Sequence, residues 1–135
     1  MSMTNYITDA LLNYLFRGIS YTPGSVVYVG LSTALIDETG VVSEPSEGGY
    51  VRQPITSGSS SWTAPGSVHY ITNSTVIDFP ESTASWGTIK AIFLADDAAI
   101  GGGNVLYFDN LDSFIPIGPS TKVTISAGKL KVEGN

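Results

Sequence analysis

Residues 79–110 constrain the fold of this chain more than any other stretch. A nearly continuous apolar run at residues 89–95 is followed by the loop Gly101-Gly102-Gly103-Asn104 and by a second apolar run at residues 105–108. A short apolar run indicates a strand that is covered on both faces. Glycines that adopt positive φ angles are typical of the turn of a hairpin. The stretch therefore predicts two paired strands joined by the glycine loop.

Other short segments with a period of two follow Gly18 and predict further strands. They lie at residues 26–31, 50–53, 76–79, 121–125 and 130–132. Pro54 confines the second of these to an edge or an end. The last two, which turn at Ala127-Gly128, form the strongest predicted hairpin of the chain. About seven short strands with frequent turns predict an all-β fold, either an antiparallel β-sandwich or a small barrel.

A single helical pattern opens the chain, with large apolar side chains spaced along one helix face. They are Ile7, Leu11, Leu12, Leu15 and Phe16. Thr4 or Asn5 can cap the first turn through a side-chain oxygen, and Gly18 follows as a stop. A helix with one apolar face must bury that face. It either closes the open end of the chain's own sheet, which is the favoured interpretation, or packs on another subunit.

Length and composition favour one domain that packs against neighbours. The chain has 135 residues, enough for one hydrophobic core, and shows no internal repeat or linker. We expect an N-terminal helix over residues 1–18 and a β domain over residues 19–135. Only 13% of the residues are charged, against the usual value of about 25%. Because charge is depleted at the centre of interfaces, this composition suits a sheet protein that assembles.

Charge and the remaining composition argue against several classes of partner. The net charge is −6 and no basic cluster occurs, so nucleic acid is not an expected partner. No apolar run approaches the length of about 18 residues that a membrane span requires. The N-terminal apolar segment is interrupted by Asp9 and Asn13 and makes a poor signal peptide. The absence of cysteine excludes disulfides and thiolate metal sites.

The residues needed for catalysis are not arranged in any recognised pattern. His69 is the one histidine, and no Gly-x-Ser-x-Gly elbow accompanies it. Asp96 and Asp97 are adjacent, so on a strand their side chains would point to opposite faces; a role at the start of the glycine loop is favoured. The acidic segment at residues 37–40 lacks the spacing of a calcium loop. We expect no enzyme activity, no cofactor and no metal.

Two irregular stretches and the aromatic residues supply the candidate interface. Residues 34–49 and 56–75 form loops of a length that is uncommon unless they bind something or move. Trp86 is expected to fill the core at one end of the fold, whereas Trp62 suits an interface and a core equally well. The candidate interface residues are Ile7, Leu11, Leu15, Trp62 and Tyr70.

The order of several motifs resembles a family of small tailed-bacteriophage proteins described as tail-fibre or minor virion structural proteins. The motifs lie at residues 28–33, 48–52, 79–80, 85–88, 102–107 and 126–130, so the resemblance spans nearly the whole chain. It implies a non-enzymatic virion component that works by assembly with copies of itself and with other virion proteins. Cyclic symmetry is expected for such an assembly.

The resemblance leaves the place of the protein in the particle open between tail and capsid. A tail fibre or tail-attached protein is favoured. The alternative is a capsid decoration (cement) protein that clamps capsid subunits, and a third interpretation is a module that binds a host glycan through Trp62 and loop carboxylates. In each case the protein would be made in the host cytoplasm and reside in the virion.

Overall fold

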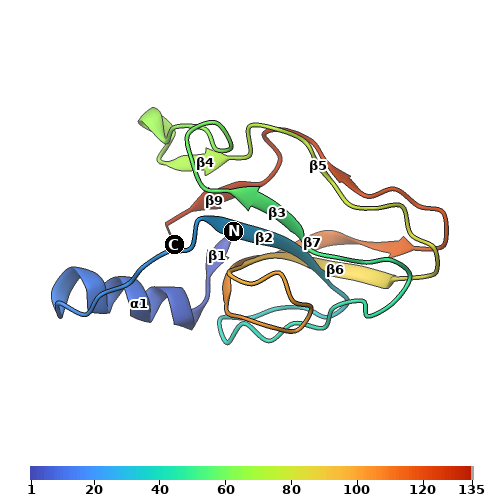
Figure 1. The fold of residues 1–135 in the computed structure, drawn as a ribbon, viewed down its shortest axis with the longest axis horizontal. Helices are drawn as coiled ribbons and strands as arrows, with labels where there is room; N and C mark the ends of the chain where they lie inside the picture. The colour runs from blue at the N-terminus through green and yellow to red at the C-terminus, as the bar shows by residue number, and fades with distance from the viewer. Residues whose placement is uncertain (135) are drawn as a thin grey trace.

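A five-stranded antiparallel sheet forms the centre of the molecule, in the strand order β1-β7-β6-β2-β3 (Figure 1). The computed structural model describes residues 1–134. The strands of this sheet are β1 Ser2–Met3, β2 Val26–Ser32, β3 Gln53–Thr56, β6 Gly87–Ala95 and β7 Val105–Ile117. One helix, α1 Asn5–Phe16, connects β1 to β2.

Two small antiparallel pairs lie above this sheet in Figure 1. One pairs β4 Tyr70–Thr72 with β9 Lys131–Glu133, and the other pairs β5 Ile77–Asp78 with β8 Thr124–Ile125. A short 3-10 helix, η1 Gly66–Val68, precedes β4. The predicted all-β class with one N-terminal helix is confirmed. The described strands form open sheets rather than a closed barrel, so the sandwich-like alternative is the one adopted.

Strand β6 is covered on both faces, as its apolar run predicts. Ile89 and Leu94 belong to the main core, together with Phe79 and Trp86. Phe93 belongs to a second cluster, formed by Ile36, Ala91, Phe93, Ala95 and Val105. Ile36 comes from the irregular stretch at residues 34–49, so this loop supplies the cover for the second face. The hairpin of β6 with β7 is likewise confirmed.

The predicted hairpin of residues 121–125 with 130–132 is wrong. Strand β8 pairs with β5 and β9 pairs with β4, so the two segments do not pair with each other. The reason is Asn73, a buried residue next to β4. Its side chain accepts a hydrogen bond from the backbone N–H of Leu130 and donates to the carbonyl of Ser126, at 3.0 and 3.2 Å. These bonds hold the turn between Ser126 and Leu130 against the segment that directly follows β4.

Strand β3 lies three residues later than predicted. The segment at residues 50–52 is buried at two positions, Tyr50 and Arg52, whose side chains enter a polar network described below. Pairing with β2 begins at Gln53. Pro54 lies within β3, at the edge of the sheet, as proline requires.

Candidate assembly surface

Helix α1 buries only the beginning of its apolar stripe. Ile7 is buried and Leu11 is half-buried, but Leu15 and Phe16 are 66% and 79% exposed. The helix extends away from the sheets along the long axis of the molecule (Figure 1). The favoured prediction, that the helix closes the open end of its own sheet, is therefore wrong. The predicted helix itself is confirmed, and its free apolar face is available to another subunit.

The base of the helix is fixed to the sheet by Thr4. Its hydroxyl donates to the carbonyl of Val105 at 2.6 Å, so it does not cap the helix as predicted. The backbone N–H of Thr4 donates to the carbonyl of Leu106. The first turn is therefore anchored on β7, whereas nothing comparable holds the last turn among the described residues.

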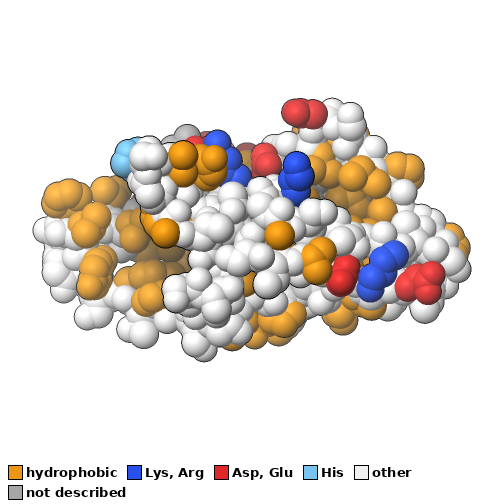
Figure 2. Space-filling view, turned by 90° about the horizontal axis from the view of Figure 1, so that it is seen from above, with side chains coloured by type: hydrophobic (Ala, Val, Ile, Leu, Met, Phe, Trp, Pro, Cys, Tyr) orange, Lys and Arg blue, Asp and Glu red, His pale blue; other side chains and the backbone are white. Residues whose placement is uncertain are grey.

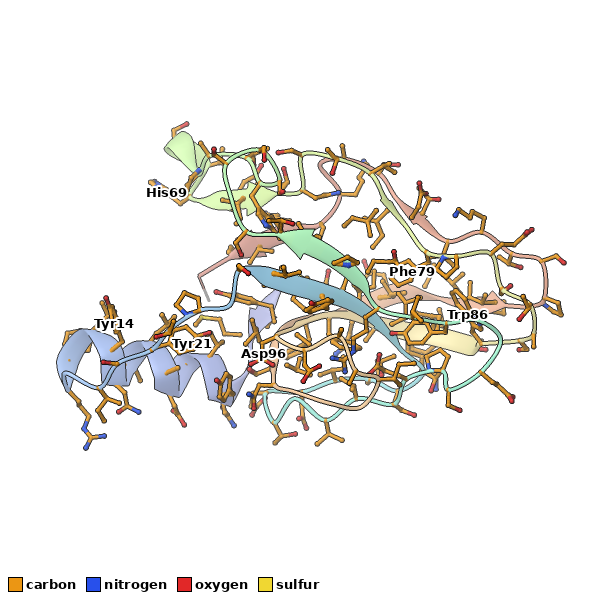
Figure 3. All side chains as sticks on the ribbon, in the orientation of Figure 1. Tyr14, Tyr21, His69, Phe79, Trp86 and Asp96 are labelled. Carbon is orange, nitrogen blue, oxygen red and sulfur yellow. The ribbon has the colours of Figure 1, made fainter. Side chains whose placement is uncertain are left out.

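The chain returns along the polar side of the helix after Gly18. The N–H of Ile19 donates to the carbonyl of Asn13, whose side chain accepts from Arg17 at 2.8 Å. A hollow of about 290 Å³ separates Asp9 and Asn13 from the returning segment, where Tyr21 lies between the helix and the sheet (Figure 3). Burial raises the pKa of the Tyr21 hydroxyl. The polar side of the helix thus faces its own chain, whereas the apolar side chains of the last turn, Leu15 and Phe16, remain exposed.

A second uncovered apolar surface is a groove between β7 and β8, which we call the β7–β8 groove. Its volume is about 320 Å³. The apolar residues along it are Leu31, Ile89, Ile92, Leu111, Ile115, Pro116, Ile117, Val123 and Ile125. Among them Ile115 is 49% exposed, and so nearly half of a large apolar side chain faces water.

A bulge in β7 forms one wall of the groove. The register jumps from Ile89–Ile115 to Ala91–Asn110, so β7 holds three more residues than β6 between these two pairs. Bulges re-aim side chains and often lie near functional sites. The jump carries Phe114 to the surface, where the ammonium of Lys90 lies 5.4 Å from the centre of its ring. Lys122, on the β8 side, is a cation among the residues that line the groove.

Hydrophobic side chains gather at both ends of the long axis in a space-filling view (Figure 2). The left end carries α1, as in Figure 1. The right end holds the start of β6 and the end of β7, which line the groove. The two apolar surfaces therefore lie at opposite ends of the molecule.

Trp62 and Tyr70 lie apart from the helix, near β4. Trp62 is half-buried against the main core and forms an isolated bridge with Asn73. Tyr70 is half-buried in β4, with the ammonium of Lys131 4.3 Å from its ring centre. The structure thus brings Ile7, Leu11 and Leu15 onto one helix but does not join them with the two aromatic residues. Trp86 is 3% exposed, which confirms its predicted place in the core.

A buried network that the sequence patterns did not predict joins three loops. Glu44 and Arg52 form an ion pair at 2.6 Å, with side chains 2% and 1% exposed. The hydroxyl of Tyr50 donates to Glu44 at 2.6 Å and accepts from the N–H of Leu31 at 2.9 Å. The pair lies eight residues apart in irregular sequence, where no periodicity marks it.

The same network fixes the glycine loop. Arg52 donates to the carbonyls of Asp97 and Gly102, at 2.6 and 3.1 Å, and Glu44 accepts from the N–H of Gly101 at 2.8 Å. Burial alone would raise the pKa of Glu44, but hydrogen bonds from Arg52, Tyr50 and Gly101 hold it below its ordinary value. Burial, followed by the bond to Glu44, raises the pKa of Tyr50.

The adjacent aspartates serve the loop. Asp96 accepts from the N–H of Asn104 at 2.6 Å, and Asp97 accepts from the N–H of Ala99 at 2.9 Å. Gly101 and Gly103 have φ angles of 75° and 69°, which confirms the predicted reason for the glycines. Both carboxylates therefore act in turn formation, as predicted.

Metal and membrane features can be stated for residues 1–134. His69 is exposed after η1, and no group of three or more metal-ligating side chains lies together in this range. No helix in the described part of the chain has the length and apolar character needed to cross a membrane.

The chain thus combines an open β fold with a free helix face and with two loop carboxylates that hold a turn. The family model of podophage GP4 fiber I protein gp80 matches residues 2–133. The chain belongs to this family of phage fibre proteins, which confirms the resemblance drawn from its motifs and makes it a virion component. No curated protein matches the chain.

Proposed function

We propose that this chain is a tail-fibre subunit that works without catalysis, by assembling with copies of itself and with other virion proteins. The observation that carries the proposal is the free apolar face of α1. Leu12, Leu15 and Phe16 are all more than half exposed, and they are adjacent on one helix. Contiguous apolar side chains on a surface mark sites of protein contact.

The length of the helix supports the same conclusion. It has twelve residues, and isolated helices shorter than about 12–15 residues are marginal in water. Most helix stability in proteins comes from packing of the apolar face. Since Leu12, Leu15 and Phe16 stay exposed, a partner that covers them would stabilise the last turns of α1.

Particle imaging tests the location. Antibody raised against the full chain is bound to intact phage particles and viewed by electron microscopy, while the copy number per particle is measured by quantitative mass spectrometry. The proposal predicts label on the tail fibres. Label spread over the head, with copy numbers in the hundreds, would contradict it and favour a capsid decoration protein.

Glycan binding is tested separately on the purified chain. The proposal predicts that the chain needs no glycan ligand for assembly, so a glycan array should show no binding that depends on Trp62. Binding that disappears with Trp62→Ala, while the variant remains folded, would favour the host-glycan module instead.

A further inference from the structure

We propose that the free face of α1 in one copy of the chain docks into the β7–β8 groove of the next copy. This inference rests on the proposed function, because it names the partner and the contact through which the subunits assemble. The surface on the helix consists of Leu11, Leu12, Leu15 and Phe16. The surface that receives it is the groove walled by the β7 bulge and by β8.

One contact between copies would cover both uncovered apolar surfaces. A second copy is therefore the occupant that the molecule itself supplies. The groove of about 320 Å³ is roughly twice the size of an apolar cavity of about 150 Å³ that holds a benzene ring. It therefore has room for about two large apolar side chains, such as Leu15 and Phe16.

The charges at the two surfaces are complementary. Lys122 lies at the groove. The carbonyl end of a helix carries a partial negative charge, which favours nearby cations. The cation at the end of α1, Arg17, is held by Asn13, a residue of the side that the returning chain follows. Docking of the free face would bring the carbonyl end of the helix towards Lys122 without bringing Arg17 against it.

The placement of the two surfaces determines the symmetry of the assembly. The helix lies at one end of the molecule (Figure 1), and the groove is lined by residues of β6, β7 and β8, so that docking is a head-to-tail contact in which different surfaces of the two copies meet. Such contacts generate a closed ring or a filament, depending on the rotation between copies.

Two complementary variants test the contact with full-length chains. Leu15→Glu disables the helix face and leaves the groove intact, whereas Ile115→Glu disables the groove and leaves the helix intact. Both side chains are about half exposed or more, so each variant should fold. Val41→Glu is the matched control, because Val41 is 72% exposed and belongs to neither surface. Folding is verified by circular dichroism, and mass is measured by multi-angle light scattering.

The inference predicts that each variant alone loses assembly and has the mass of a single chain, while the control assembles like the wild type. An equimolar mixture of the two variants should form a pair and nothing larger, since only one intact helix and one intact groove can meet. Assembly of Ile115→Glu alone to the wild-type mass would overturn the groove as partner while leaving the proposed assembly function standing. A wild-type chain that stays single at every concentration would contradict both.

Cysteine cross-linking supplies a second measurement, because the chain has no cysteine of its own. Leu15→Cys copies mixed with Ile115→Cys copies should form a disulfide-linked pair under mild oxidation. Rapid cross-linking of Leu15→Cys copies with one another, and not with Ile115→Cys copies, would show helix against helix and overturn the inference.

Discussion

Gly30 of β2 lies directly opposite Phe93 of β6, a register partner that is fully buried. A β-carbon on Gly30 would overlap the end of the Phe93 ring. The guanidinium of Arg52 lies over the ring, with its central carbon 5.2 Å from the ring centre, and opposes a shift of the ring. Glycine is required here for close approach, and its φ angle is not positive.

Gly30→Ala is therefore expected to lower the free energy of unfolding by about 1–3 kcal/mol, the usual effect of overpacking a core. The measurement is chemical denaturation followed by tryptophan fluorescence. Gly24→Ala is the matched control, because a β-carbon there meets no atom closer than 3.6 Å. Equal stability of the two variants would show that the ring has room to shift.

Glu44 makes stability depend on pH. Its pKa is lower in the folded chain than the ordinary value of 4.5, so the unfolded chain binds the proton more readily. The stabilisation is thus present above about pH 4.5 and is lost as pH falls through the lower, folded pKa. In Glu44→Gln this acid-dependent loss should shrink, measured by denaturation at a series of pH values.

At neutral pH the same substitution should lower the free energy of unfolding by about 3–5 kcal/mol, because it leaves the buried Arg52 without its counter-charge. Glu47→Gln, at an exposed position of the same loop, is the control and should change little. If Glu44→Gln unfolds with the same acid dependence as the wild type, the carboxyl responsible lies elsewhere.

Single residues were predictable where their environment is local. Trp86 precedes an apolar strand and fills the core, and Gly101 and Gly103 follow from the need to turn the chain. The pair Glu44–Arg52 was not predictable, because the bonds that justify a buried charge come from a loop more than forty residues away. Nothing in the neighbouring sequence marks such a contact.

At the scale of elements, Asn73 decides how the C-terminal segments pair. Its amide also donates to the carbonyl of Thr75, so it makes three bonds to backbone groups. The alternating pattern of residues 121–132 fits a hairpin equally well, and the pattern carries no information about which strand lies alongside. The sequence therefore predicted strands in this region but not their partners.

Asn73→Ala is expected to lower the free energy of unfolding by about 1–3 kcal/mol for each buried backbone group it leaves unsatisfied. Thermal denaturation measures the loss, and hydrogen exchange at Leu130 would report it locally through faster exchange. Ser74→Ala, on an exposed neighbour, is the control. A slow, unchanged exchange rate at Leu130 would contradict the role given to Asn73.

Helix α1 shows the same division between what a pattern determines and what it does not. The period of its apolar residues and the glycine at position 18 predicted the helix and its end, but the helix begins at Asn5, after β1, and not at residue 1. The surface on which the helix packs was not predictable, since the same apolar stripe suits burial on the chain's own sheet and burial on another chain. Thr4 bonds to β7 instead of capping the helix. This bond fixes where the first turn is attached, but it does not determine what the rest of the helix packs against.

At the scale of the molecule, the low content of charged residues and the two separate apolar surfaces both favour a protein that assembles with other chains. The described chain closes a core around β6 and still exposes Leu15 and Phe16 at one end and Ile115 at the other. The proposed contact between copies would account for both exposures, because it would bury each of them against another chain. The division into one domain, residues 1–135, stays a prediction.

The mass of the full-length chain in solution, as a function of its concentration, tests this account most directly. Sedimentation equilibrium of the wild type should show a mass above that of one chain that rises with concentration. Leu15→Glu should remain at the mass of one chain over the same range. A folded wild-type protein that keeps the mass of a single chain at every concentration would contradict self-assembly through the helix.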